Sequence, residues 1–258
     1  MKISVIGLGL IGGSIFKDLR KLGYECIGIS QSQQGIEEVY SDYEHLEGSD
    51  LVFVCKEMSK TLETLRAIEP YLNENTVVTD VCSLKGFLTQ KSYSFNFVPS
   101  HPMAGTEFSG WQSAQEGLFE GAKWVITPLE DNYKPCVLEE VITKLGAETV
   151  YTTPEEHDSA VAMISHTPMV MAQALFKMCE DNELALKLAS SGFRDMTRLA
   201  LSSIDMANDM VSMNSENIQD CILKFYTTMG ELIKDYREQI PQIKAKREKM
   251  YKDGKNVL

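Results

Sequence analysis

A glycine-rich segment near the start of the chain has the spacing of a phosphate-binding turn. Gly7, Gly9 and Gly12 form the pattern Gly-x-Gly-x-x-Gly directly after an apolar run. Between a strand and a helix, the first glycine permits a tight turn, the second lets the backbone approach a pyrophosphate, and the third allows close helix packing. The alternative is a glycine-rich turn without a ligand. We expect a bound dinucleotide, contacted by Gly7, Gly9, Leu10, Ile11 and Gly12.

The end of the next apolar run indicates which dinucleotide binds. An NAD site usually carries an acidic residue about 20 residues past the glycines, where it binds the ribose 2′-hydroxyl. Here the run ends in Ser30, Gln31 and Ser32, with neither an acid nor a base beside them. Hydroxyls and an amide can hydrogen-bond a 2′-phosphate, so these three residues favour NADP over NAD, which stays the alternative.

Two polar residues capable of acid–base chemistry follow later apolar runs. His101 lies before Pro102, just past a predicted strand, and Ser83 follows another strand that ends at Asp80. Parallel sheets bind ligands at the carboxyl ends of their strands. An imidazole with a pKa of about 6.5 suits removal of a hydroxyl proton near neutral pH. The alternatives are a loop histidine bonded to backbone and a serine that caps a helix.

The elements that must position these residues alternate between strands and helices in the first part of the chain. Short apolar or β-branched runs predict strands, and amphipathic stretches predict helices at 14–22 and 137–145. This alternation predicts a doubly wound, parallel α/β sheet of the Rossmann type. The predicted strands are 2–6, 24–30, 51–55, 76–80, 95–100, 123–127 and 148–151.

The pattern becomes helical after Thr153. Pro154 suits the first turn of a helix, and Glu155 and Glu156 suit its dipole. Pro168 lies inside the following helical stretch and should bend it, freeing a carbonyl near Ile164. We therefore predict a dinucleotide-binding domain at 1–153 and an all-helical domain at 154–258.

Composition excludes several classes of protein. The 258 residues are 43% hydrophobic and 24% charged, as in ordinary globular proteins, and the net charge of −12 opposes nonspecific nucleic-acid binding. The longest unbroken apolar runs have five residues, far short of the roughly 20 of a membrane helix. The six cysteines form no CxxC motif, and the four histidines lack metal-binding spacing. We expect a cytoplasmic protein with reduced thiols, no metal site and no membrane contact.

Several segments together resemble the prephenate and arogenate dehydrogenase family. The resemblance runs in order from residue 3 to about residue 217, and the His-Pro-Met-Ala-Gly segment with the later Phe-Arg-Asp-x-Thr-Arg segment is its most specific part. The matching segments are Gly7–Ser14, Asp80–Gly86, Ser100–Glu107, Leu118–Ala122, His157-Asp158, Ser165–Pro168 and Gly192–Ala200.

The resemblance implies an NAD(P)-dependent oxidative decarboxylation in tyrosine biosynthesis, catalysed by a homodimer. The expected substrate is prephenate, a cyclohexadienol with two carboxylates, which becomes 4-hydroxyphenylpyruvate. Hydride leaves the carbinol carbon, carbon dioxide departs, and the ring becomes aromatic. The enzyme has to align the reactants and remove the hydroxyl proton.

The resemblance also assigns roles to individual residues. His101 is the catalytic base, and Ser83 hydrogen-bonds the histidine or the substrate hydroxyl. Arg198 clamps a substrate carboxylate with its planar fork; the alternative is a surface ion pair, for example with Asp195. Arg194 is a weaker candidate, and Lys85 adds positive potential unless it is a solvated lysine. Further substrate contacts are expected from Thr106, Glu107, Ser165 and His166.

Three departures from the family pattern bear on the substrate. Met169 stands where many prephenate enzymes have a second histidine, Met210 replaces a tryptophan that reaches across the dimer, and Ser30 replaces the NAD-binding acid. Two of these changes, at residues 169 and 30, resemble the NADP-linked arogenate enzymes. Arogenate carries an ammonium group that a carboxylate such as Glu107 favours, so an arogenate dehydrogenase is the alternative to a prephenate dehydrogenase.

Two more distant functions remain. A β-hydroxyacid dehydrogenase or imine reductase has a similar two-domain plan, but its motifs fit less of this chain. A nucleotide sensor would bind NADP without turnover, which the presence of His101, Ser83 and Arg198 argues against.

Overall fold

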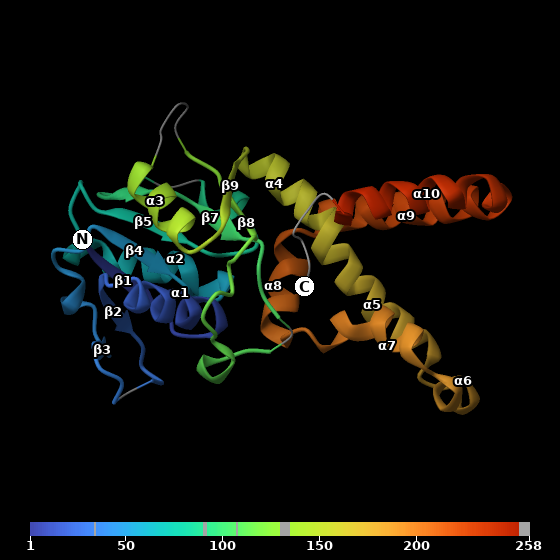
Figure 1. Ribbon diagram of the computed structural model, residues 1–258, viewed down its shortest axis with the longest axis horizontal. Helices are drawn as coiled ribbons and strands as arrows, with labels where there is room; N and C mark the ends of the chain where they lie inside the picture. The colour runs from blue at the N-terminus through green and yellow to red at the C-terminus, as the bar shows by residue number, and fades with distance from the viewer. Residues whose placement is uncertain (34, 90–91, 107, 130–134, 253–258) are drawn as a thin grey trace.

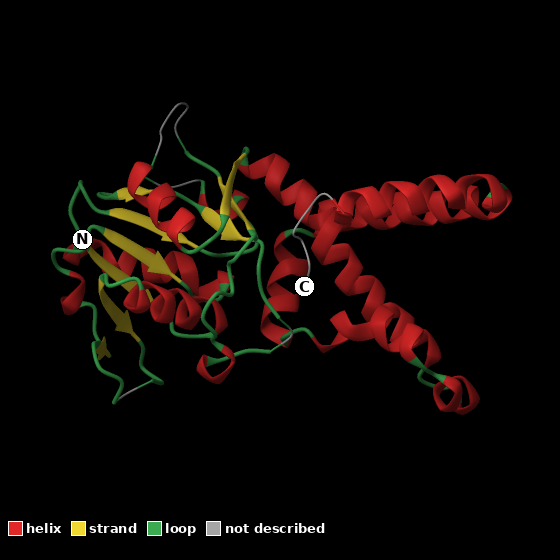
Figure 2. Cartoon of the chain, in the orientation of Figure 1, coloured by secondary structure: helices red, strands yellow, loops and turns green. Residues whose placement is uncertain are grey.

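The chain folds into a sheet-containing part and a helical part (Figure 1). In Figure 2 the strands and the helices that cover them lie on one side, and long helices extend away on the other. The structure is a computed structural model that describes residues 1–33, 35–89, 92–106, 108–129 and 135–252.

The main sheet has six parallel strands in the order β3-β2-β1-β4-β5-β6. Its centre is β1, where Val5 pairs with Gly28 on one side and with Phe53 on the other. The chain order reverses across β1, which creates the crevice in which such sheets bind ligands. The strands are β1 (Lys2–Ile6), β2 (Glu25–Ile29), β3 (Val39–Tyr40), β4 (Leu51–Val54), β5 (Val77–Asp80) and β6 (Asn96–Phe97).

Helices cover both faces of this sheet, as expected for a doubly wound fold. Phe53 packs with side chains of α1 (Leu10–Lys21) and α3 (Cys136–Lys144), while Val52 and Val54 pack with α2 (Met58–Ile68) on the opposite face. This alternation along one buried strand explains its continuous apolar run. The first helix begins at Leu10, four residues before the predicted start, because the glycine turn already forms its first turn.

The last three strands do not continue the parallel sheet, so that prediction was wrong. β7 (Ser100–Pro102), β8 (Lys123–Ile126) and β9 (Glu148–Tyr151) form a separate sheet, in which β7 is antiparallel to β8. The predicted strand 95–100 is split between β6 and β7. Pro99 lies at the break, where its missing N–H interrupts a strand ladder.

The helical part begins directly after β9. The first three helical segments form one bent rod, and α9 and α10 run back along each other as a hairpin (Figure 1). The elements are α4 (Pro154–Val161), η5 (Ala162–His166), α5 (Thr167–Cys179), α6 (Glu183–Leu188), α7 (Ser191–Thr197), η6 (Arg198–Leu201), α8 (Ile204–Met213), α9 (Ser215–Lys234) and α10 (Tyr236–Lys252). Short 3-10 turns lie elsewhere at η1 (Glu44–Leu46), η2 (Glu69–Tyr71), η3 (Gly86–Leu88) and η4 (Trp111–Ser113).

Two local features predicted from the sequence, the start of the helix at Pro154 and its disruption near Pro168, are present in the bent rod. Thr153 caps α4 by accepting a hydrogen bond from the backbone N–H of Glu156 at 3.2 Å, with Pro154 in the first turn. The disruption expected from Pro168 is a π-helical segment, η5, which ends two residues before the proline. Such segments are frequent at functional sites.

One helical run in the described residues, Pro154–Cys179, is long and apolar enough to cross a membrane, which is weak evidence by itself. The run contains His166, which is fully buried and lies 3.2 Å from Asn214 of the α8–α9 turn. All six cysteines are unpaired.

Candidate active site

The glycine turn is shaped for close approach of a ligand to the backbone. Gly7 has a φ of +90°, and a Cβ there would lie 2.3 Å from the carbonyl oxygen of Cys55 at the end of β4. A Cβ on Gly12 would lie 2.0 Å from the oxygen of Gly7, so only glycine allows helix α1 to pack this closely. By contrast, a Cβ on Gly9 would meet no described atom within 4 Å. The first and third glycines are therefore needed by the fold, and the second leaves room for a ligand.

The start of α1 is open beside that space. Gly9 is the N-cap residue and supplies no side-chain hydrogen bond to the helix amides. Leu10 and Ile11 are half-buried in the first turn. Unpaired amides at a helix N-terminus bind phosphate, so these residues fit the pyrophosphate of a dinucleotide.

Ser30, Gln31 and Ser32 lie across β1 from the later site residues, at the end of β2. Ser30 is buried, and its hydroxyl accepts a hydrogen bond from the backbone N–H of Gln33 at 3.2 Å. Gln31 and Ser32 are exposed. These three described residues offer two hydroxyls and an amide at this end of the sheet.

A buried ion pair fixes the strand that carries His101. Lys85 and Asp80 are both fully buried and paired with each other, and Lys85 also donates to the carbonyl oxygen of Ser100 at 2.6 Å. Asp80 accepts from the backbone N–H of Ser100 at 3.1 Å and from that of Cys82 at 2.8 Å. Lys85 is therefore not a solvated lysine. It joins the end of β5 to the start of β7 and so positions the neighbouring imidazole.

His101 lies half-buried in β7 and faces helix α4. Its Nδ1 atom lies 3.0 Å from Nε2 of His157, with the two rings nearly perpendicular at 82°. Burial and the Lys85 ammonium hold the pKa of the His101 ring well below its usual 6.5, and the neighbouring imidazoles act in the same direction. The ring is therefore neutral at neutral pH, as a general base must be.

Ser83 follows β5 on the same side of the sheet. Its hydroxyl donates to the sulfur of Met58 at 3.5 Å, which is a weak acceptor. The structure therefore shows His101 bonded to His157 and Ser83 bonded to Met58, not to each other. No helix begins at Ser83, since the N-cap of η3 is Lys85, so the alternative of a helix cap is wrong.

His166 brings a third imidazole to the site from the π-helical segment. Asn214 donates its amide N–H to the backbone carbonyl of Asp158 at 2.9 Å and lies 3.2 Å from Nδ1 of His166. Nδ1 is thus the acceptor, so Nε2 carries the proton, and this buried N–H has no partner among the described residues. Burial lowers the pKa of His166 to about 4. An unpaired buried donor is costly unless a ligand accepts from it. Ser165 beside it is half-buried.

The remaining predicted substrate contacts lie on the surface. Arg198 is exposed at the start of η6, and the next residue, Leu199, packs against a cluster that includes Met103 and Met58. Asp195, which the sequence offered as an alternative partner of Arg198, pairs with Arg194 at 3.4 Å. Thr106 is exposed and accepts a hydrogen bond from the backbone N–H of Phe108 at 3.3 Å. Glu107 lies outside the described residues.

The two methionines that depart from the family pattern are buried together. Met169 and Met210 belong to the same cluster as Cys82 and Leu84, at the junction of the two parts of the chain.

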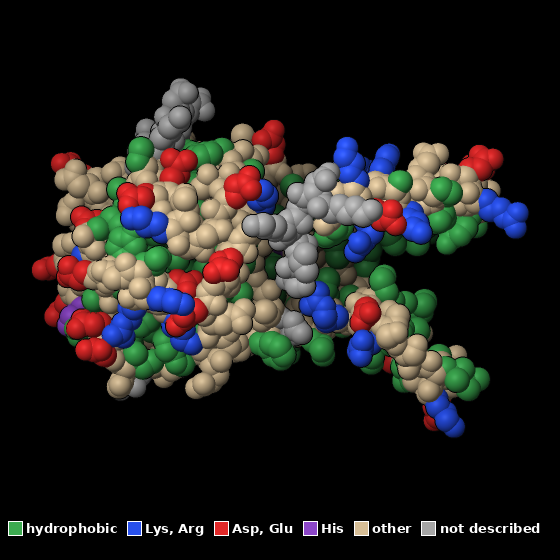
Figure 3. Space-filling model, in the orientation of Figure 1, with side chains coloured by type: hydrophobic (Ala, Val, Ile, Leu, Met, Phe, Trp, Pro, Cys, Tyr) green, Lys and Arg blue, Asp and Glu red, His purple; other side chains and the backbone are tan. Residues whose placement is uncertain are grey.

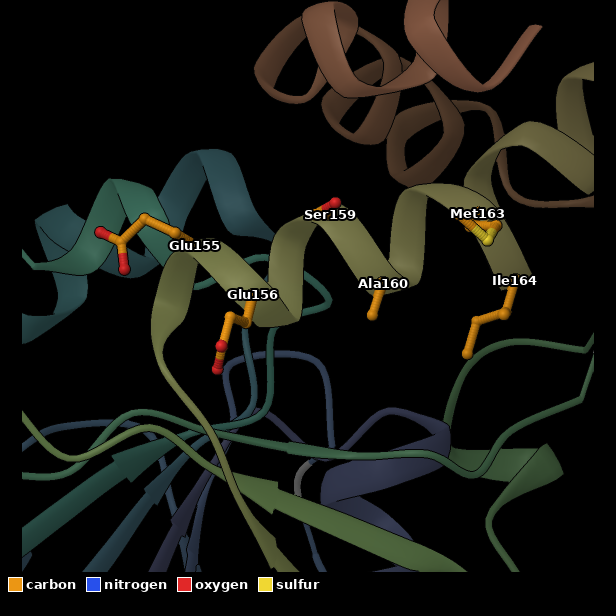
Figure 4. A pocket seen from close by; sticks show the side chains of 6 residues that line it. All are labelled: Glu155, Glu156, Ser159, Ala160, Met163 and Ile164. Atoms are coloured by element: carbon orange, nitrogen blue, oxygen red, sulfur yellow. The ribbon is translucent and has the colours of Figure 1, made fainter. Parts of the chain in front are cut away.

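An open hollow of about 530 Å³ lies along α4 but is not the candidate site. Figure 4 shows Glu156, Ala160 and Ile164 along one side of this helix. Two carboxylates, those of Glu155 and Glu156, line the hollow. They would repel an anionic ligand, and none of the predicted site residues takes part.

Sequence reasoning gave no role to four residues that support the site. Asp80 fixes Lys85, Asn214 orients His166, and the adjacent pair His157-Asp158 contacts His101 and the loop after β5. The sequence contained a signal for the pair alone. A histidine directly followed by an aspartate near the start of a helix can form a hydrogen bond between the two side chains, as it does here. Asp80 and Asn214 gave no such signal, because their roles depend on contacts with Ser100 and His166, which lie 20 and 48 residues away.

Comparison with known families matches two consecutive pieces of the chain between residues 27 and 245. The family model "Prephenate dehydrogenase, nucleotide-binding domain" matches residues 27–151. The model "Prephenate dehydrogenase, dimerization domain" matches residues 153–245.

Individual relatives agree with these matches. The prephenate dehydrogenase of Bacillus subtilis is 32% identical over 84% of this chain, which spans 65% of that enzyme's length. The crystal structure of Synechocystis arogenate dehydrogenase is 32% identical, covers 98% of each chain and superposes with a TM-score of 0.77. The Aquifex aeolicus prephenate dehydrogenase bound to hydroxyphenyl propionate and NAD+ is 27% identical over 97% of this chain and 98% of its own, with a TM-score of 0.84.

Proposed function

The chain belongs to the prephenate dehydrogenase family, and on that premise we propose that it converts prephenate to 4-hydroxyphenylpyruvate in tyrosine biosynthesis. The reaction is an NAD(P)-dependent oxidative decarboxylation. The observation that carries this proposal is the position of His101. Its neutral, half-buried imidazole lies in β7, next to Ser100, which is bonded to Asp80 at the carboxyl end of β5.

The residues of this chain have separate tasks in the reaction. His101 takes the proton of the substrate hydroxyl as hydride leaves the carbinol carbon, and returns it to the phenolic oxygen when the ring becomes aromatic. Ser83 turns its hydroxyl from Met58 toward the substrate oxygen, since a thioether is a weak partner. A bound nicotinamide supplies the hydride acceptor. Protons and electrons then balance, with carbon dioxide and the reduced cofactor as co-products.

Substrate binding requires local positive and donor groups, because the protein carries a net charge of −12. We assign Arg198 to a substrate carboxylate, since a guanidinium can bind it through two parallel hydrogen bonds. The unpaired Nε2–H of His166 and the hydroxyls of Ser165 and Thr106 are assigned as further donors. Glu107 is kept as a proposed substrate contact.

NADP is the proposed preferred form of the cofactor. Support comes from Ser30, Gln31 and Ser32, where a 2′-phosphate meets no carboxylate. A Ser30→Asp variant should weaken NADP+ binding and strengthen NAD+ binding, measured as quenching of tryptophan fluorescence. Equal affinities of the unaltered protein for both cofactors would contradict the preference.

Arogenate is the alternative substrate. The thioether of Met169 at the position of a histidine supports it. Identity does not separate the two substrates, because it is 32% both to the Synechocystis arogenate enzyme and to the Bacillus subtilis prephenate enzyme. Reduction of cofactor at 340 nm, followed with each substrate and each cofactor, separates the possibilities. We expect the highest kcat/KM with prephenate and NADP+.

The same assay tests the role of His101. His101→Asn should lower kcat by about 10²- to 10⁴-fold, whereas His45→Asn, at a partly exposed histidine, should leave it unchanged. Tight NADP+ binding without reduction by any substrate would contradict the proposal and favour a nucleotide sensor.

A homodimer is the proposed assembly. The helical part leaves large apolar side chains exposed, and Figure 3 shows them on the hairpin and on the lower helical arm. Leu223, Tyr226 and Ile233 of α9 are 66%, 74% and 75% exposed. Monomeric proteins rarely expose large apolar side chains together, so this surface fits a subunit interface. Light scattering should give twice the 29.0 kDa chain mass. The unpaired cysteines support a cytoplasmic location.

A further inference from the structure

The proposed base is bonded to a second histidine that has no role in the steps above. His101, His157 and Asp158, which we call the imidazole network, lie in a row from β7 into α4. We propose that His157, held by Asp158, is a positioning residue that fixes the tautomer of His101 and keeps its Nε2 atom free to accept the substrate proton. This role rests on the proposed dehydrogenation and deepens it.

The hydrogen bonds determine where each proton lies. Asp158 accepts from the backbone N–H groups of Lys85 and Gly86, both at 2.8 Å, and its Oδ1 lies 2.8 Å from Nδ1 of His157. A carboxylate oxygen only accepts, so Nδ1 of His157 carries a proton, and in the neutral tautomer with that proton Nε2 accepts. The proton between the two rings therefore belongs to Nδ1 of His101.

The consequence is a lone pair on the opposite nitrogen of His101. A neutral imidazole has one N–H, and here Nδ1 holds it. Nε2 is then unprotonated and available as a base. In the other tautomer Nε2 would carry the proton and could not accept one from the substrate.

The site of Asp158 is built for this contact. A Cβ on Gly86 would lie 2.9 Å from Oδ2 of Asp158, so a larger residue would crowd the carboxylate. His157 is 3% exposed, and the Asp158 side chain is 14% exposed. Water therefore competes weakly, and the carboxylate fixes the orientation of the ring.

The imidazole network also stabilises the positive charge that forms on His101 during proton transfer. When Nε2 of His101 takes the proton, the ring becomes a cation whose Nδ1–H still donates to His157. The negative charge of Asp158 stabilises that cation through the intervening ring. No electron is transferred within the network, and the proton leaves again with the phenolic product.

The other titratable groups around His101 do not replace this role. The ammonium of Lys85 lies behind the strand and is paired with Asp80, and the neutral His166 enters from η5. Lys85 opposes protonation of His101. Asp158 is thus the anion placed to fix the proton on the far nitrogen.

NMR of the histidine ring nitrogens identifies the tautomers directly, and the measurement does not depend on enzymatic activity. The chain has only four histidines, so full-length protein labelled with ¹⁵N-histidine gives a simple spectrum. We expect His101 and His157 as Nδ1–H tautomers and His166 as the Nε2–H tautomer. In His157→Phe, the His101 ring should change to the Nε2–H form. An Nε2–H form of His101 in the unaltered protein, or no change in His157→Phe, would overturn the proposal.

Two substitutions separate positioning from packing. His157→Phe fills the same space but accepts no hydrogen bond, and should lower kcat by about 100-fold with KM and cofactor affinity nearly unchanged. His157→Gln offers a side-chain oxygen to Nδ1–H of His101 and should recover about tenfold of that loss. His45→Gln is the control, at a partly exposed histidine on η1.

Equal kcat values for the Phe and Gln variants, or a kcat for His157→Phe within threefold of the unaltered enzyme, would also refute the role. A failure of the proposed function looks different. The NMR spectrum would then show the expected tautomers, while no combination of substrate and cofactor would be turned over.

Discussion

Lowering the pH should destabilise the protein through His166 by an amount that follows from its burial. The ring is fully buried, and its pKa falls from 6.5 to about 4 in the folded protein. In the unfolded chain the ring regains a pKa of about 6.5. The folded state therefore binds fewer protons between these two values, and stability must fall as the pH falls through this window.

The size of the effect follows from the two pKa values. Each unit of difference corresponds to about 1.4 kcal/mol, so the full loss is about 3 kcal/mol once the pH is below both values. At pH 5 the unfolded ring is almost fully protonated and the folded ring is not, which gives a loss of about 2 kcal/mol relative to pH 8. That is a large fraction of a typical free energy of unfolding.

Urea unfolding at pH 8 and pH 5 measures this loss. The variant His166→Gln lacks the titrating group, so its free energy of unfolding should fall by about 2 kcal/mol less than that of the unaltered protein. His45→Gln serves as the matched control and should behave like the unaltered protein, because this ring is partly exposed, with 41% of its side chain accessible. The protein concentration is held constant, since association of subunits adds to apparent stability.

The comparison refutes the reasoning if His166→Gln and the unaltered protein lose the same stability between pH 8 and pH 5. Carboxylates and the other histidines also respond to acid, but they are shared by both proteins, so the difference isolates His166. His166→Asn provides a second variant without a titrating ring if the first does not fold.

Three further outcomes test the site. Gly12→Ala should lower the free energy of unfolding by several kcal/mol, because its Cβ would lie 2.0 Å from the oxygen of Gly7; an unchanged urea midpoint would contradict this. Gly9→Ala should unfold like the unaltered protein, since its Cβ meets no described atom within 4 Å, but should bind cofactor more weakly in a fluorescence titration. Lys85→Met should cost about 3–5 kcal/mol in urea unfolding by leaving the buried charge of Asp80 unpaired. The double variant Lys85→Met with Asp80→Leu should recover part of this loss, and no recovery would argue against an unpaired charge as the cause.

The sequence by itself determined the features that depend on neighbouring residues. The glycine spacing predicted the turn between β1 and α1, because only glycine fits the close contacts there. Apolar runs predicted the buried strands, and Pro154 with its flanking residues predicted the start of α4. Pro168 predicted the disruption of the long helix, since a proline removes a backbone donor wherever it lies.

Tertiary structure decided the features that depend on residues far apart in the chain. The sequence did not indicate that β7 would leave the parallel sheet, because strand pairing is set by which edges meet in space. Nor did it show that Lys85 is buried rather than solvated, because this depends on Ser100, 15 residues away, as well as on Asp80. The contact between His101 and His157 spans 56 residues. The protonation of an imidazole depends on the donors and acceptors around it, and those are chosen only when the chain has packed.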